Sequence, residues 1–211
     1  MKKRGLLLGS FDPIHIAHIN IASCALNSGL CDEIFFVVAK HNPWKSHEPA
    51  PFDLRCKMIE ASIIPFNGKC SVCDLEKDIE PPTYSYKVID KICEKYPEDE
   101  LYIIAGTDTI QRISHWKNFD TNINGKVKFI EVTRGDKELS IDESSGNPFA
   151  IKYCTYDKLG EVPVIITHRM DISSTMVRNL VKDDMNPIPY VTNETYKIII
   201  KNKLYKNGNN N

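Results

Sequence analysis

Long hydrophobic runs and an excess of positive charge are both missing from this chain of 211 residues. No apolar stretch approaches the roughly 20 residues that span a membrane, so we expect no membrane association. Lys and Arg total 27 against 28 Asp and Glu, and the net charge of −1 disfavours a broad nucleic-acid surface. We expect a cytoplasmic protein in which a small anionic ligand is held by a local cluster of positive groups.

A metal-binding pattern is also missing. The seven cysteines are odd in number and scattered, which is typical of reduced thiols in a reducing compartment. Cys70 and Cys73 form a lone CxxC without a second ligand pair at zinc spacing, so we interpret them as structural residues of a strand. No cluster of carboxylates indicates a dedicated metal site.

The chain has neither the Gly-Lys-Ser/Thr of a Walker loop nor the three glycines of a dinucleotide fingerprint. It has instead GSFDPIHIAH at residues 9–18, directly after a short apolar strand. The spacing puts His15 and His18 on one side of the first turn of a helix, beside unpaired backbone N–H groups. Zinc ligation or plain surface histidines are the alternatives, and the strand–turn–helix context favours a phosphate cradle.

Strand and helix patterns alternate along most of the chain, which predicts an α/β fold with a doubly wound parallel sheet. We expect strands over residues 3–9, 34–39, 72–75, 101–105, 127–132 and 164–167. We expect helices over residues 15–27, 54–63, 85–96, 173–183 and 193–205. Residues 135–160 lack periodicity and are interpreted as a surface excursion. One domain is expected over residues 1–206, with a disordered Asn-rich tail at 207–211.

A second anion-binding motif is ISSTMVR, at residues 172–178. Ser173, Ser174 and Thr175 open a helix with hydroxyls and free N–H groups, and Arg178 lies one turn after Ser174. A plain serine cap followed by a solvated arginine is the alternative. The order of the two motifs along the chain favours a shared phosphate site.

Three further segments follow predicted strands or open predicted helices. They are HNPWK at residues 41–45, PPTYSY at residues 81–86, and IIAGTDT with HWKNF at residues 103–109 and 115–119. Each segment has an ordinary alternative: a solvated loop lysine in HNPWK, a helix cap in PPTYSY, and a core tryptophan in HWKNF. Ligands of doubly wound sheets bind beyond the carboxyl ends of the strands, so the positions of these segments favour binding roles.

The first motif resembles the (G/T)SFDPxHxGH motif of the HxGH nucleotidyltransferases, above all the nicotinate-mononucleotide adenylyltransferases. The second resembles the ISSTxxR motif of the same family and matches it in Ile172, Ser173, Ser174, Thr175 and Arg178. Leu8 and Ala17 depart from the pattern, since glycine is common at the first position and standard at the second. Ala17 adds one methyl group, which loosens the approach to an adenine and raises helix propensity.

The resemblance implies a Rossmann-like nucleotidyltransferase fold and assigns site residues. His15, His18, Lys45 and Arg178 would be catalytic. The ATP site would consist of Gly9, Ser10, Phe11, His15, His18, Lys45, Gly106, Asp108, Ile172, Ser173, Ser174, Thr175 and Arg178. The mononucleotide site would consist of Ser10, Phe11, Asn42, Lys45, Thr83, Tyr84, Ser85, Trp116 and Arg134. Mg²⁺ would accompany the ATP phosphates rather than occupy a protein cage.

The implied reaction joins ATP and nicotinate mononucleotide to give deamido-NAD and pyrophosphate, a step of NAD biosynthesis. Preference for the acid over the amide follows from N–H donors at the helix start near Thr83 and Ser85. A pantetheine-phosphate adenylyltransferase, a cytidylyltransferase and a non-catalytic nucleotide-binding or chaperone-like protein remain alternatives. The sequence leaves open whether the chain forms a homo-oligomer.

Overall fold

A twisted sheet runs through the centre of the computed structural model, which describes residues 1–40, 48–134, 152–167 and 170–206. In this part of the chain the sheet has seven strands in the order β3-β2-β1-β4-β5-β7-β6. All neighbouring strands are parallel except β6 and β7, which are antiparallel. The strands are β1 (Lys3–Gly9), β2 (Glu33–Val38), β3 (Cys70–Cys73), β4 (Glu100–Gly106), β5 (Lys128–Arg134), β6 (Lys152–Tyr156) and β7 (Gly160–Thr167).

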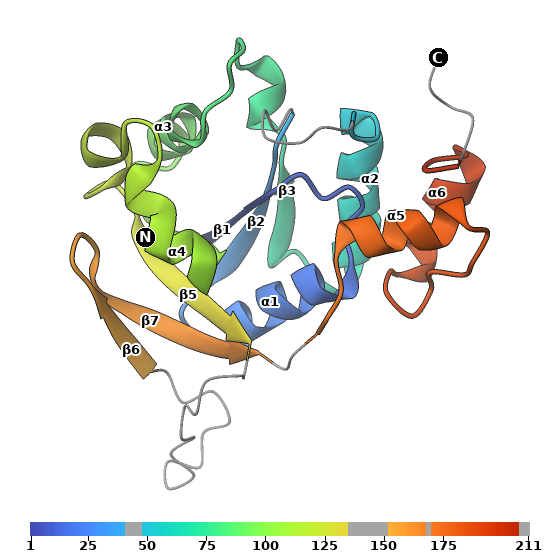
Figure 1. Cartoon of the computed structure of the whole chain (residues 1–211). Coiled ribbons are helices and arrows are strands. Elements are labelled where there is room, and N and C mark those ends of the chain that lie inside the picture. Colours follow the sequence, from blue (N-terminus) through green and yellow to red (C-terminus); the bar gives the residue numbers. More distant parts are fainter. Residues whose placement is uncertain (41–47, 135–151, 168–169, 207–211) are drawn as a thin grey trace, which may run out of the picture.

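Helices cover both faces of this sheet (Figure 1). One face carries α1 (Ile16–Asn27), α2 (Phe52–Ile63), α5 (Ser174–Lys182) and α6 (Asn193–Lys201). The other face carries α3 (Ser85–Lys95) and α4 (Thr107–Arg112). Short helical turns connect the larger elements: η1 (Ile64–Phe66), η2 (Leu75–Asp78), η3 (Ile113–His115) and η4 (Phe119–Ile123). This two-faced cover confirms the predicted doubly wound α/β class.

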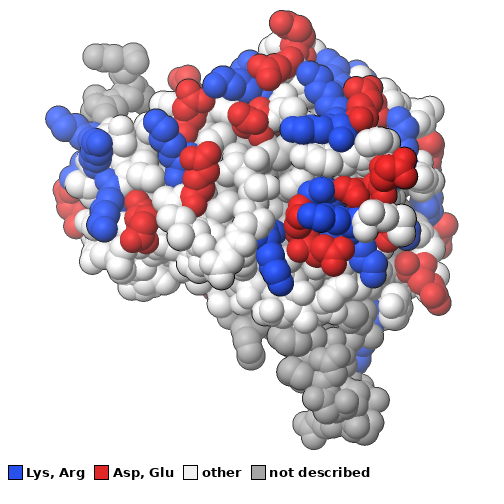
Figure 2. All heavy atoms as spheres, turned by 180° about the vertical axis from the view of Figure 1, so that it is seen from behind, with Lys and Arg blue, Asp and Glu red and all other residues white. Residues whose placement is uncertain are grey.

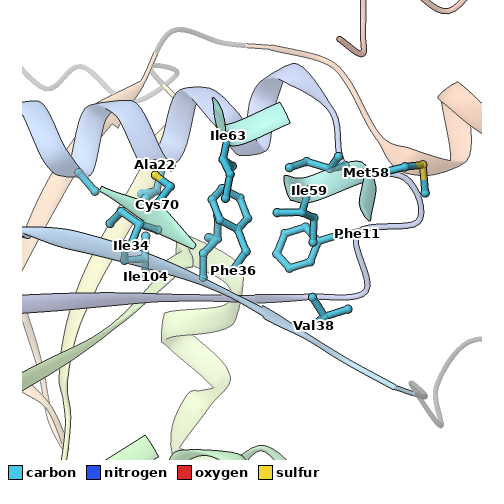
Figure 3. Close-up of a cluster of buried hydrophobic side chains, with 14 of the residues drawn as sticks. Phe11, Ala22, Ile34, Phe36, Val38, Met58, Ile59, Ile63, Cys70 and Ile104 are labelled. Atoms are coloured by element: carbon cyan, nitrogen blue, oxygen red, sulfur yellow. The ribbon is translucent and has the colours of Figure 1, made fainter. Parts of the chain in front are cut away.

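The central strands are apolar without interruption because both of their faces are buried. Alternate side chains of each strand enter two separate clusters. In β2, for example, Phe36 and Val38 pack with Met58 and Ile59 of α2 (Figure 3), whereas Phe35 and Val37 join α3 residues on the opposite side. Each central strand therefore connects two cores.

The order of the strands reverses at β1. Its partners are β2 on one side and β4 on the other, and both pairings are parallel. The connections after β1 and β4 therefore leave the same edge of the sheet and diverge to opposite faces. Sheets of this type bind ligands in the crevice at that reversal point. The loop that begins at Gly9 and the turn at Gly106 lie at the rim of this crevice.

Several predicted boundaries were wrong. The third strand covers Cys70–Cys73 rather than residues 72–75, because Leu75 begins the turn η2. The last helix ends at Lys201 rather than at 205, since Lys203 and Tyr205 adopt positive φ angles that a right-handed helix excludes. The helix α4 was not expected, because its six residues are too few for a clear apolar repeat.

The expected surface excursion at residues 135–160 is also wrong in part, because Lys152–Tyr156 forms the edge strand β6. Its burial alternates between half-buried and exposed side chains, as expected of a strand at the edge of a sheet. Residues 135–151 and the tail at 207–211 lie outside the described residues. The prediction of one domain over residues 1–206 stays a prediction.

The cysteines are unpaired, and the charged side chains are mixed, as the composition predicts. All seven cysteines are free thiols, and burial raises the pKa of both Cys31 and Cys70 to about 12. None of the helices in the described residues is both long enough and apolar enough to cross a membrane. Figure 2 shows acidic and basic side chains interspersed on one face of the molecule, without a large area of a single sign.

Candidate functional site

The loop after β1 takes a strained path that its glycine permits. Phe11 has a φ of +46°, in the left-handed region that side chains rarely adopt, and its ring is buried in the core. A Cβ atom on Gly9 would lie 3.0 Å from Cζ of this ring, which is closer than real Cβ contacts normally are. The Phe11 ring meets His18 edge-on at 5.0 Å between centroids, so Phe11 supports the histidine from within the core.

The two histidines lie at the start of α1. His15 is the N-cap residue rather than part of the helix, and Nδ1 of His18 accepts the backbone N–H of His15 at 3.3 Å. The two rings are stacked, with centroids 3.7 Å apart. His15 is buried and His18 is half-buried. Both rings therefore lie together at the start of α1.

The start of α5 is joined to the same loop. Ser173 caps α5, as predicted, by accepting the N–H of Met176 at 3.1 Å. The Ser174 hydroxyl donates to the Pro13 carbonyl at 2.9 Å, and Nη1 of Arg178 donates to the Asp12 carbonyl at 2.8 Å. These bonds bring the two predicted anion-binding motifs together. They also mean that the Ser174 proton is used within the protein.

Asp12 connects this loop to the rest of the site. Its carboxylate is 1 % exposed, and Oδ1 accepts both the N–H of Ala50 at 3.0 Å and the hydroxyl of Tyr205 at 2.8 Å. Nη1 of Arg178 lies 3.7 Å from Oδ2. Burial, and then the neighbouring Asp12 charge, raise the pKa of Tyr205 well above its usual value, so its hydroxyl remains a donor.

Arg55 is a buried positive charge near the buried carboxylate of Asp12. This α2 residue is 1 % exposed, and its guanidinium donates to four backbone carbonyls. Those carbonyls belong to Ser10 in the loop after β1 (2.6 Å) and to Ala39 (2.7 Å), Lys40 (3.1 Å) and Ala50 (2.8 Å) after β2. Burial lowers the pKa of Arg55, and the Asp12 charge opposes that shift.

A cavity of about 620 Å³ opens at the reversal point of the sheet, between the carboxyl ends of β1 and β4. Several predicted site residues line it: Gly9, Ser10, Thr83, Tyr84, Ser85, Gly106 and Trp116. Its floor consists of apolar strand residues such as Leu8 and Ile104. A cavity with apolar walls and a few polar groups is typical of a small-molecule site.

The cavity wall on the α3 side combines aromatic rings with charge. Trp116 is half-buried, and the Lys117 ammonium lies 4.2 Å from the centroid of the Tyr84 ring. Glu76 of η2, which is 6 % exposed, lines the same cavity. Flat aromatic faces suit an electron-poor ring, and the lysine adds positive charge at that wall.

Other predicted site residues lie elsewhere. Asp108 is exposed in the first turn of α4, and Ile172 is half-buried just before the α5 cap. Arg134 ends β5 at the ligand-binding edge of the sheet. Asn42 and Lys45 lie outside the described residues, as does the side chain of Arg134.

The described residues form no group of three or more His, Cys, Asp or Glu side chains that could hold a metal ion. Mg²⁺ needs no such group, because it dehydrates reluctantly and commonly binds through substrate phosphates and water.

Sequence reasoning missed Arg55 and Glu76. Arg55 had a detectable signal, because it lies three, four and seven residues before Met58, Ile59 and Ser62 and so shares the buried face of α2. Glu76 had none, since a glutamate between Leu75 and Lys77 has the pattern of a solvated turn.

Comparison with known proteins agrees with this architecture. Residues 6–180 match the model of the cytidylyltransferase-like family. A protein of Clostridium botulinum (strain Okra), named probable nicotinate-nucleotide adenylyltransferase, is 31% identical over 207 residues, covering 98% of this chain and 100% of its own length. A protein of the same name from Endomicrobium trichonymphae is 33% identical over 208 residues, with the same coverage of both chains.

One solved structure is similar along almost the whole chain. It is nicotinic acid mononucleotide adenylyltransferase from Plasmodium falciparum, complexed with NaAD. The TM-score is 0.74 at 25% identity, and the match covers 97% of this chain and 98% of the other.

Replacement of Arg55 by Met should lower both stability and activity. The change leaves four carbonyls without their donor and removes one of the two positive charges near Asp12, so we expect the free energy of unfolding to fall by about 3 kcal/mol or more. Urea denaturation measures it. Lys57→Met, at an exposed position of the same helix, is the control and should shift stability by no more than about 0.5 kcal/mol. Equal stability of the two variants would contradict the role given to Arg55.

Gly106→Ala separates ligand approach from folding. A Cβ atom there would lie 3.9 Å from the Val132 carbonyl, an ordinary contact, so we expect normal stability. If a ligand packs on this backbone, the methyl group should weaken its binding by about 1–3 kcal/mol, or roughly 10- to 100-fold. Gly9→Ala should instead destabilise the fold through the Phe11 ring. Unchanged kinetics for Gly106→Ala would show that no ligand approaches this position.

Proposed function

The chain belongs to the cytidylyltransferase-like family, and we propose that it transfers the adenylyl group of ATP to nicotinate mononucleotide, producing deamido-NAD and pyrophosphate. This reaction is a step of NAD biosynthesis. The observation that carries the proposal is the joining of two helix N-termini, with their His and Arg side chains, beside an aromatic-walled cavity at the reversal point of the sheet.

The transfer needs no nucleophile from the protein. A phosphate oxygen of the mononucleotide attacks the α-phosphorus of ATP, a new P–O bond forms there, and the bond to the bridging oxygen of pyrophosphate breaks. The protein contributes alignment and stabilisation of charge on the leaving group. His15, His18, Lys45 and Arg178, together with the N-termini of α1 and α5, are proposed to bind the triphosphate.

The hydrogen bonds around Asp12 support the role proposed for Arg178. One guanidinium nitrogen is bound to the Asp12 carbonyl and another to the Thr175 hydroxyl, at 2.8 and 3.0 Å. Arginine carries five N–H donors, so the side chain is held in one orientation with N–H groups still available for phosphate oxygens. Mg²⁺ bound to those oxygens would neutralise part of the triphosphate charge.

The α3 side of the cavity is proposed to hold the mononucleotide, with its ring against Trp116, and the Gly106 side is proposed to border the ATP site. The N-terminus of α3, which begins at Ser85 after Thr83 and Tyr84, favours a carboxylate on that ring. The Lys117 ammonium adds positive charge at the same wall. An amide placed against N–H donors would lose about 1–3 kcal/mol, which favours the acid by roughly 10- to 100-fold.

The alternative enzymes considered from the sequence differ in the acceptor or in the nucleotide that they use. Pantetheine phosphate carries no flat ring to stack on Trp116, and a cytidylyltransferase would use CTP rather than ATP. We propose that the protein binds ATP and nicotinate mononucleotide, and that neither nucleic acid nor a membrane is among its partners. A cytoplasmic location and a homo-oligomeric state stay predictions.

Pyrophosphate release tests the reaction directly. The purified protein is given ATP or CTP with nicotinate mononucleotide, nicotinamide mononucleotide or pantetheine phosphate. We expect release with ATP and nicotinate mononucleotide, and a kcat/KM for the acid at least about tenfold above that for the amide. Equal values for acid and amide would refute the proposed preference. Absence of release with every pair would refute the enzyme.

His18→Ala and Arg178→Ala should each lower kcat by on the order of 100-fold, because each removes a group proposed to stabilise transition-state charge. Lys182→Ala is the matched control, since this exposed residue ends the same helix as Arg178. Circular dichroism verifies folding. A folded His18→Ala variant with near wild-type turnover would contradict the assignment of roles.

A further inference from the structure

Glu131 is a buried carboxylate that the proposed reaction does not use. It lies in β5 opposite Ala105 of β4 and Val164 of β7, and it is 4 % exposed. Its neighbours Ile130 and Val132 enter the core on the α1 side, while Phe129, two residues away, enters the core on the α3 side. Glu131 therefore points toward the face that carries α3 and α4.

Two hydroxyl groups converge on this carboxylate. Oγ1 of Thr107 donates to Oε1 at 2.5 Å, and the hydroxyl of Tyr156 donates to Oε2 at 2.5 Å. Thr107 is the first residue of α4, and Tyr156 is the last residue of the edge strand β6. Burial and the bond to Glu131 raise the pKa of Tyr156, so the phenol keeps the proton that it donates.

Burial of a carboxylate is costly, and an apolar side chain of similar size would commonly be as stable at such a position. The bond to Thr107 gives the carboxylate a use that an apolar residue lacks. Thr107 follows Gly106, and both Gly106 and Thr109 line the cavity. The side chain of Thr107 therefore points away from the ligand crevice and fixes the turn that borders it.

We propose that Glu131 is a positioning residue that holds the Gly106–Thr109 turn in its ATP-binding geometry through the hydroxyl of Thr107. The inference rests on the proposed function in taking ATP as the nucleotide at this turn. The other hydrogen bond of Glu131, from Tyr156, fixes the edge strand β6. The effects of the two bonds on ATP binding and on stability can therefore be separated.

Four variants test this inference: Glu131→Ala, Glu131→Gln, Thr107→Val and Tyr156→Phe. Binding of a non-hydrolysable ATP analogue is measured by calorimetry, beside kcat, the KM for each substrate and the thermal midpoint. Thr107→Val and Glu131→Ala should weaken analogue binding about tenfold and raise the KM for ATP, with a smaller effect on kcat, as expected for loss of a preorganised site. The amide of Glu131→Gln accepts a hydrogen bond from one hydroxyl and donates one to the other, so this variant should bind the analogue within about twofold of wild type.

Tyr156→Phe is the matched control, because it removes the other bond of the same carboxylate. It should lower the thermal midpoint while leaving analogue binding within about twofold of wild type. Wild-type binding by Thr107→Val would overturn the inference, as would equal losses of binding in Thr107→Val and Tyr156→Phe. Binding of the analogue requires no acceptor substrate, so it can be measured even if the adenylyl-transfer assay fails. Failure of this inference is therefore distinguishable from failure of the proposed function.

Discussion

The buried guanidinium of Arg55 is the interaction on which the site depends. The loops after β1 and β2 leave the sheet at neighbouring positions, since the two strands are paired in parallel. Four of their carbonyls are satisfied by this one side chain. Asp12, which also binds Ala50 and Tyr205, balances the charge nearby. The strained loop can therefore persist, since surrounding bonds determine its path.

The same network joins distant parts of the chain. Asp12 and Pro13 accept bonds from Arg178 and Ser174 across more than 160 residues, and Tyr205 reaches Asp12 from beyond α6. These contacts place the starts of α1 and α5 side by side. An anion in front of them would meet the positive ends of two helix dipoles, which neither helix offers alone. The aromatic cavity opens at the reversal point, where Gly9 and Ser10 of the same loop line it, so the sites proposed for the two substrates adjoin.

The sequence was sufficient for the fold class and for the two anion-binding motifs. The apolar run at residues 34–39 indicated a strand buried on both faces, and the Ser173 cap was visible from its hydroxyl and the helical pattern after it. It was insufficient for β6. An edge strand with one exposed face has weak apolar alternation, and its pairing with β7 depends on the sheet already being in place.

The sequence by itself determined that a strand–turn–helix with two histidines would stand at the edge of a parallel sheet, because local spacing and apolar periodicity are properties of neighbouring residues. Only the tertiary structure decided that Phe11 supports His18 from the core, that the Ser174 proton is donated to Pro13, and that Arg55 and Glu131 are buried. Each of these depends on partners from other elements. A charged residue is stable inside a protein only where such partners converge, and convergence is a property of the folded chain.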